Sequence, residues 1–235
     1  MQNQMQNPEG MLNGIIYKAI NDIPVQIEQN LREELPEITL ITSAAPKYTE
    51  VSLSLIKYLV NNRKFAGIYV TVNRPYESMK QMLEKTVDLR YLVFIDGSSS
   101  SAPTSVDKDK KDLYRAWQEV RVSRIQKSKP EQTKECLYLA NIKNLTDFIM
   151  AIDQAIGALQ ALQNPVGVKK FLVLDSPSTL LIYNDAGSVS KFLHYIAMRL
   201  RESKVKGIFL VLERESDKNF IDQLCLFSDN VLNIK

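Results

Sequence analysis

Residues 170–174 have the sequence Lys-Phe-Leu-Val-Leu and lead directly into Asp175-Ser176. A strand with one face in water alternates apolar and polar residues, whereas this run is apolar without a break after its lysine. Residues 67–72, Gly-Ile-Tyr-Val-Thr-Val, and residues 207–212, Gly-Ile-Phe-Leu-Val-Leu, follow a similar pattern. Strands of this kind are buried on both faces, as in a parallel sheet that helices cover on each side. These three runs therefore predict an α/β fold.

Short apolar runs recur along the chain and are separated by segments with helical periodicity. The predicted strands are residues 37–42, 67–72, 91–95, 136–140, 170–174, 207–212 and 230–234, of which the last is expected at an edge. The predicted helices include residues 50–60, 144–162 and 188–201. Asn144 is a favourable N-cap for the second of these, with Asp147 three residues further on. Repetition of strand and helix predicts right-handed crossovers and a three-layer α/β/α sandwich with a mostly parallel sheet.

The length of 235 residues suits a single domain over residues 1–235. We expect residues 1–35 to form an N-terminal helical extension and residues 97–135 to be an insertion with a flexible loop and a basic helix. Residues 104–135 contain nine Lys or Arg and six Asp or Glu, which accounts for the whole net charge of +3. The candidate basic patch consists of Arg115, Arg121, Arg124 and Lys127. A solvated helix with Trp117 packed inward is favoured there over a nucleic-acid surface.

Composition excludes several classes of protein. The chain has one histidine and two cysteines, too few for a zinc site of the usual types, so no metal site is expected. The N-terminus lacks the basic and apolar regions of a signal peptide, and no apolar run approaches the roughly 18–20 residues that span a bilayer. We therefore expect a cytoplasmic protein without a membrane partner.

The segment after the first predicted strand, residues 43–50, has the sequence Ser-Ala-Ala-Pro-Lys-Tyr-Thr-Glu. Ligands of open α/β sheets bind beyond the carboxyl ends of the strands, and a phosphate loop there needs glycines, a lysine and a Ser or Thr. This segment contains no glycine, and Pro46 has no N–H to offer a phosphate. Glu50 falls in the first helical turn, where we expect its carboxylate to fill the anion site. Lys47 lies about two residues early for phosphate binding.

Five segments follow one another in an order shared with a known superfamily. They are residues 40–42 with 51–59, residues 69–77, residues 171–181, residues 205–213 and residues 229–234. Together they resemble the RecA/KaiC-like ATPases over about residues 36–235, and the run from Phe171 to Asp175 is similar to the Walker B strand of that family. The resemblance is closest to a degenerate, mostly archaeal branch of the superfamily.

The resemblance implies which catalytic positions have changed. The phosphate-binding lysine aligns with Thr49, the magnesium-binding Ser or Thr aligns with Glu50, and the glutamate that activates water falls at Val72 or Asn73. Of the catalytic set only Asp175 is retained, so no catalytic residues, ATP or magnesium are expected. The degenerate nucleotide-site positions are Lys47, Tyr48, Thr49, Glu50, Asp175 and Ser176.

Three functions stay open at this point. The preferred one is a non-catalytic RecA/KaiC-like domain that acts as an interaction, scaffold or regulatory protein, with a protein partner or a homo-oligomer. The alternatives are a nucleotide-binding sensor that does not hydrolyse ATP and a nucleic-acid-binding protein that uses the basic insertion. Polar residues at the expected strand ends could also line a small-molecule crevice, namely Asp96, Ser98, Asp175, Ser176, Ser178 and Glu213.

Overall fold

The computed structural model describes residues 22–32, 34–99, 136–161, 168–214 and 217–234. The strands are β1 (Ile38–Ala44), β2 (Ala66–Thr71), β3 (Leu92–Asp96), β4 (Cys136–Leu139), β5 (Lys170–Asp175), β6 (Val205–Glu213) and β7 (Asn230–Ile234). The α-helices are α2 (Ile23–Asn30), α3 (Tyr48–Lys57), α4 (Tyr76–Leu83), α6 (Leu145–Ala161), α7 (Pro177–Leu180), α8 (Ala186–Glu202) and α9 (Lys218–Cys225). A π-helix, η1 (Tyr58–Asn62), continues α3, and a 3-10 turn, η2 (Leu89–Tyr91), precedes β3.

The strands form one seven-stranded sheet in the order β4-β3-β2-β5-β6-β1-β7. Every neighbouring pair is parallel. All seven predicted strands are present within one or two residues of their predicted ends, and β7 lies at an edge as expected. Because all strands run the same way, their carboxyl ends meet along one edge of the sheet, and this is the edge where ligands bind in such folds.

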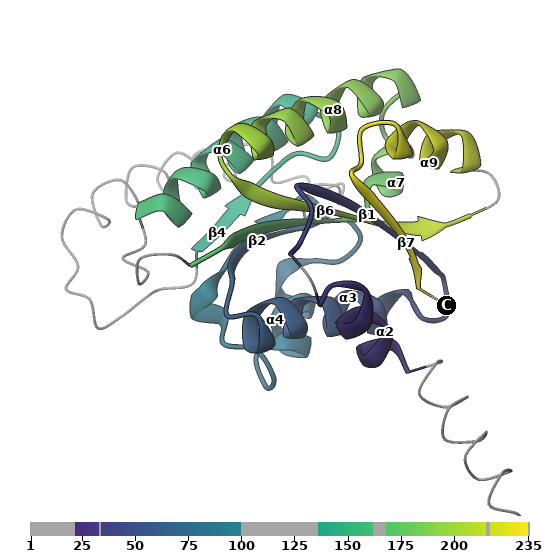
Figure 1. Cartoon of the computed structure of the whole chain (residues 1–235). Coiled ribbons are helices and arrows are strands. Elements are labelled where there is room, and N and C mark those ends of the chain that lie inside the picture. Colours follow the sequence, from purple (N-terminus) through teal and green to yellow (C-terminus); the bar gives the residue numbers. More distant parts are fainter. Residues whose placement is uncertain (1–21, 33, 100–135, 162–167, 215–216, 235) are drawn as a thin grey trace, which may run out of the picture.

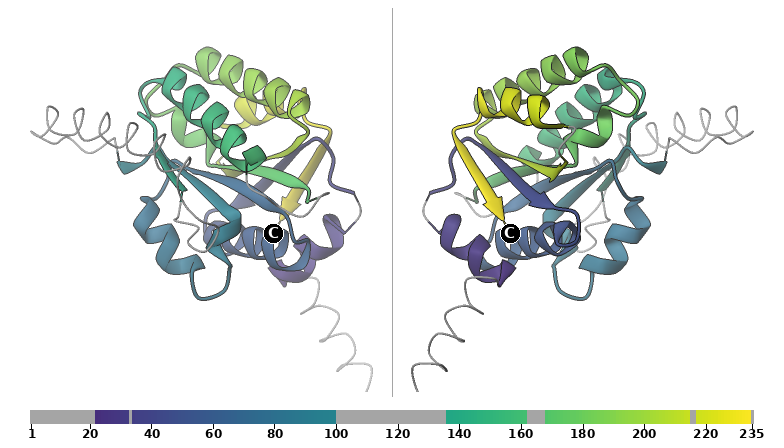
Figure 2. Two further views of the ribbon diagram at one scale, coloured as in Figure 1. Left: turned by 90° about the vertical axis from the view of Figure 1, so that its left-hand side faces the viewer. Right: turned by 90° about the vertical axis from the view of Figure 1, so that its right-hand side faces the viewer.

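Helices cover both faces of the sheet, which gives the predicted three layers (Figure 1). α6, α8 and α9 lie on one face and α2, α3 and α4 on the other, as the two side views also show (Figure 2). Successive residues of β5 alternate between the two cores: Phe171 and Val173 join the core under α3, whereas Leu172 and Leu174 join the core under α6 and α8. Burial on both faces explains why the strand sequences are continuously apolar.

The predicted helices are also present, with small shifts at their ends. α6 begins at Leu145, and the Asn144 side chain accepts a hydrogen bond from the Thr146 N–H at 3.1 Å and donates one to Asp147 at 2.9 Å. α8 extends the predicted 188–201 helix by a few residues. α3 begins at Tyr48, two residues before its predicted start, so Tyr48 is already helical.

Two predicted regions lie largely outside the described residues. Of the N-terminal extension, α2 is described, and its Ile23 and Ile27 are buried in the core under the sheet. The candidate basic patch, Arg115, Arg121, Arg124 and Lys127, lies within residues 100–135, which are outside the described part of the chain. Within the described ranges, none of the helices combines the length and the hydropathy that a membrane-spanning segment requires.

Candidate functional site

The candidate site lies where the carboxyl ends of β1, β2, β5 and β6 meet. In the register of the sheet, Thr71 at the end of β2 is paired with Asp175 of β5 on one side and with Asp96 of β3 on the other. α3 begins immediately beyond β1 and packs on the face that also carries Tyr69. The sequence therefore brings α3, the β2–α4 connection and the end of β5 together around Asp175.

The connection between β1 and α3 is only three residues long, Ala45 to Lys47. Its backbone closes on itself: the Lys47 N–H donates to the Ala44 carbonyl at 3.1 Å, and the Tyr48 N–H donates to the Ala45 carbonyl at 3.4 Å. Pro46, which lies between Ala45 and Lys47, has no N–H. Of the amides that a phosphate loop would point at an anion, Pro46 offers none and those of Lys47 and Tyr48 are engaged within the turn.

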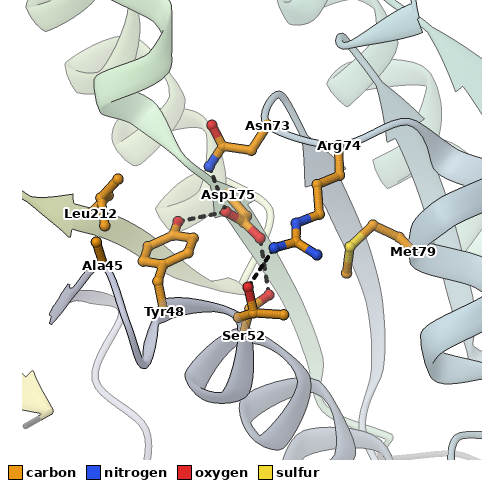
Figure 3. Close-up of a pocket in the computed structure, with 9 residues that line it drawn as sticks. Ala45, Tyr48, Ser52, Asn73, Arg74, Met79, Asp175 and Leu212 are labelled. Atoms are coloured by element: carbon orange, nitrogen blue, oxygen red, sulfur yellow. Dashed lines mark hydrogen bonds between the residues drawn. The ribbon is translucent and has the colours of Figure 1, made fainter.

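Asp175 is only 4% exposed, and its carboxylate is surrounded by four side-chain donors, which together with it we call the Asp175 cluster. Figure 3 draws three of these donors, Tyr48, Ser52 and Asn73. Its Oδ1 accepts from the Tyr48 hydroxyl at 2.5 Å and from the Asn73 amide at 3.3 Å. Its Oδ2 accepts from the Ser52 hydroxyl at 2.9 Å and from the Tyr69 hydroxyl. A carboxylate offers about four acceptor positions, so these contacts account for its whole capacity.

The donors of the Asp175 cluster are themselves held by neighbouring elements. The Tyr48 hydroxyl also lies 2.9 Å from the carbonyl oxygen of Leu210 on β6. The Ser52 and Tyr69 hydroxyls lie 2.8 Å apart, so together with Asp175 Oδ2 they form a triangle of oxygens that shares two hydrogens. The side-chain oxygen of Asn73 accepts from the Thr179 hydroxyl. The cluster therefore joins α3, β2, β5 and β6.

Both tyrosines are buried, Tyr48 with 8% of its surface exposed and Tyr69 with none. Burial raises the pKa of each hydroxyl well above the ordinary value, and the negative charge of Asp175 raises it further. Both hydroxyls therefore remain protonated at neutral pH and act as donors to the carboxylate. Among the described residues, no three His, Cys, Asp or Glu side chains gather as a metal site would require.

A cavity of about 270 Å³ lies beside the Asp175 cluster, between α3 and α4. Its lining residues are Ala45, Tyr48, Thr49, Ser52, Asn73, Arg74, Met79, Asp175 and Leu212. Figure 3 shows that Arg74 extends from the β2–α4 connection toward α3. One of its terminal nitrogens donates to the Thr49 hydroxyl at 2.5 Å, and the other contacts the Met82 sulfur at 3.6 Å.

Two of the expected site residues, Glu50 and Lys47, do not line the cavity. Glu50 was expected to fill the anion site, but its side chain is exposed and does not line the cavity, and the group that reaches Asp175 is the Tyr48 hydroxyl. The sequence could not distinguish these residues because both fall in the first turn of α3. Lys47 is half-buried and lies outside the cavity.

Of the residues that could line a polar crevice, only Asp175 lines this cavity. The hydroxyls of Ser176 and Ser178 lie 2.9 Å apart, and both residues are buried. Asp96 ends β3, and the Ser98 N–H in the loop that follows donates to its carboxylate at 2.8 Å. Glu213 is exposed and accepts a hydrogen bond from Asn233 at 3.1 Å.

Sequence reasoning assigned no role to Ser52, Tyr69 or Arg74. A signal existed for the first two. Ser52 follows Tyr48 by four residues and thus shares its helix face, and a tyrosine inside a buried strand needs a partner for its hydroxyl.

The order of the strands and the helices on both faces define a RecA-like α/β domain. A solved structure supports this class: the chain is similar to the uncharacterised protein PH0321 from Pyrococcus horikoshii, solved in complex with an unknown peptide, at 12% identity and a TM-score of 0.58. The match covers 88% of this chain and 81% of PH0321. The KaiC-like protein PH0186 from Pyrococcus horikoshii is similar at 15% identity with a TM-score of 0.49, over 88% of this chain and 76% of that one. The expected RecA/KaiC-like fold is confirmed.

The chain belongs to DUF7504, a family of unknown function, whose model matches residues 70–234. That range includes Asn73, Arg74 and Asp175 but begins just after Tyr69 and leaves out α3 with Tyr48 and Ser52. No curated protein matches the chain in sequence.

Proposed function

We propose that the protein is a non-catalytic RecA/KaiC-like domain that acts as an interaction, scaffold or regulatory protein. The observation that carries this proposal is the Asp175 cluster. In the family that the chain resembles, the aspartate at this position helps to hold magnesium. Here its acceptor positions are met by Tyr48, Ser52, Tyr69 and Asn73. A magnesium ion demands near-ideal octahedral oxygen geometry and would have to displace these donors.

The turn between β1 and α3 supports the same proposal. Catalysis of phosphoryl transfer consists mostly of positioning the phosphates and stabilising their charge. The turn offers no glycine and engages the Lys47 and Tyr48 amides within itself. Thr49, which aligns with the phosphate-binding lysine of the family, instead accepts a hydrogen bond from Arg74. A triphosphate would therefore lack the glycine-rich backbone cradle of the family and a lysine at its usual position.

With the nucleotide positions occupied by the protein itself, the fold retains its shape without needing a bound nucleotide. A protein or peptide partner fits this interpretation, and the unknown peptide bound to PH0321 is consistent with it. A homo-oligomer is the second form that the proposal allows. In either case the Asp175 cluster has a structural role, as it joins four elements at one edge of the sheet.

The proposal is tested by following ATP hydrolysis and thermal unfolding with and without magnesium and ATP. We expect no magnesium-dependent hydrolysis and no change in Tm at millimolar ATP. A ligand at 100 times its Kd would add about 2.7 kcal/mol to the free energy of unfolding, which such a measurement detects easily. The matched variants are Glu50→Ala, which removes an acidic side chain outside the cavity, and Asp175→Asn.

Two results would overturn the proposal. One is turnover that depends on magnesium and is lost in Asp175→Asn but kept in Glu50→Ala. The other is a saturable rise in Tm with ATP that requires magnesium and disappears in Asp175→Asn, which would instead establish the nucleotide-binding sensor.

A further inference from the structure

Arg74 lines the cavity without a carboxylate partner among the described residues. The ion pairs in the described part of the chain involve other residues, namely Arg90–Asp88, Lys169–Glu34, Arg199 with Asp153 and Glu202, and Arg201 with Glu37 and Asp229. The Arg74 side chain is half-buried, and its contacts are the Thr49 hydroxyl and the weakly accepting Met82 sulfur. A guanidinium has five N–H donors in a planar fork, so most of its donor capacity is not used by the protein.

The walls of the cavity differ in polarity. Thr49, Ser52, Asn73 and Arg74 bring polar groups, whereas Ala45, Met79 and Leu212 contribute apolar surface. A volume of about 270 Å³ is slightly below the usual range of sites for drug-sized ligands, roughly 300–1,000 Å³. The site therefore fits a ligand of a few carbon atoms with one polar end.

We propose that this cavity binds a small ligand with a single carboxylate and a short apolar tail, with the carboxylate paired to the guanidinium of Arg74. The planar fork of arginine matches the two oxygens of a carboxylate. The apolar tail lies against Met79, Leu212 and Ala45. This inference rests on the proposed function in one respect, since it requires that no nucleotide occupies this edge of the sheet.

Asp175 limits the charge of the ligand. Its carboxylate lines the same cavity, so an anion with two or more charges is repelled more strongly than a monoanion. A cationic ligand is not favoured either, because the acceptor positions of Asp175 are already met by Tyr48, Ser52, Tyr69 and Asn73. A monocarboxylate uses the available guanidinium and leaves the Asp175 cluster undisturbed.

The experiment titrates the full chain with acetate, propionate and butyrate at constant ionic strength, and follows amide NMR signals to obtain each Kd. Butylamine and inorganic phosphate serve as a cation and as a multiply charged anion. We expect saturable shifts for the carboxylates, with affinity rising about four-fold for each methylene that the apolar wall buries. Arg74→Gln should weaken butyrate binding about ten-fold or more, and Arg74→Lys should weaken it less.

Arg90→Gln is the matched control, because it removes a guanidinium that is paired with Asp88 and does not line the cavity. Butyrate should bind this variant as it binds the original protein. The proposal is overturned if no carboxylate gives saturable shifts at tens of millimolar, if Arg74→Gln binds butyrate unchanged, or if phosphate binds as tightly as butyrate. A parallel titration with ATP and magnesium separates the two proposals. Magnesium-dependent ATP binding alone defeats the non-catalytic assignment, whereas absent carboxylate binding alone defeats the present inference.

Discussion

The two strands that flank β2 each end in a buried aspartate, and the two aspartates occupy equivalent places in the sheet. Asp96 on β3 and Asp175 on β5 are both paired in register with Thr71, and their exposed fractions are 2% and 4%. Their donors, however, differ in kind. Asp96 accepts from the backbone N–H groups of Tyr76, Ser98 and Ser99 and from the Ser99 hydroxyl. Asp175 accepts from side chains alone.

This difference separates a local role from a long-range one. Asp96 organises the loop that directly follows it and the start of α4, which a short polar side chain does in many turns. Asp175 receives Tyr48 and Ser52 from 127 and 123 residues away in the sequence and Tyr69 from 106 residues away. Its side-chain partners come from separate segments, α3, β2 and the β2–α4 connection, so this contact forms only when the whole sheet and its helices are assembled.

The largest effect is expected from Asp175→Ala, which removes the common acceptor of four donors. Buried donors without an acceptor each cost about 1–3 kcal/mol, and partial rearrangement of the hydroxyl triangle recovers some of this. We expect the free energy of unfolding to fall by about 3–5 kcal/mol, measured by denaturant unfolding. Asp175→Asn, which keeps one acceptor oxygen, should lose less. A smaller loss for Asp175→Ala than for Asp96→Ala would contradict the comparison.

The sequence predicted the fold well because its signals were local. Short apolar runs marked every strand of the sheet, several of them continuous, and Asn144 with Asp147 marked the start of α6. The boundary of α3 was placed two residues late, since Tyr48 and Thr49 carry no capping signal that distinguishes a loop from a first helical turn. The order of the strands was not predicted, because periodicity does not reveal which strands are neighbours.

The candidate site was predicted only in part, because its contacts are long-range. Asp175 and Tyr48 were both singled out, but no local pattern shows that the hydroxyl of one reaches the carboxylate of the other. Glu50 was given the central place for its charge, although the helix turns its side chain to solvent. Arg74 was read only as part of the strand–helix junction, since its pairing with Thr49 joins two separate segments.

The two tyrosines give the next largest effect, which depends on pH. Their pKa values are raised in the folded protein, so near pH 10 the unfolded chain ionises them while the folded chain does not. The stabilising contribution is complete below the ordinary tyrosine pKa and is lost as pH rises above it, by up to about 2.7 kcal/mol per pH unit for two groups.

Denaturant unfolding between neutral pH and pH values above about 10 measures this loss. The absorbance of tyrosinate should show that Tyr48 and Tyr69 titrate only when the chain unfolds. In a Tyr48→Phe, Tyr69→Phe double variant the steep alkaline dependence should be reduced, whereas Tyr183→Phe, at an exposed position, should leave it unchanged. If the free energy of unfolding fell equally steeply with pH in the original protein, the double variant and Tyr183→Phe, Asp175 would not hold its partners as protonated donors.

The smallest effect is expected at Asp96, which is paired with Thr71 on the side opposite Asp175. Asp96→Ala removes an acceptor from the Ser98 and Ser99 amides, but Ser98 is only half-buried and Ser99 is exposed, so water replaces much of the loss. Only the buried Tyr76 amide loses an acceptor far from solvent. We expect the free energy of unfolding to fall by about 1–2 kcal/mol.

Amide hydrogen exchange should quicken at Tyr76 and Ser98 while the amides of β5 keep their protection, because the substitution opens a loop and leaves the Asp175 cluster intact. Faster exchange throughout β5 would mean that the two aspartates act as one unit across β2.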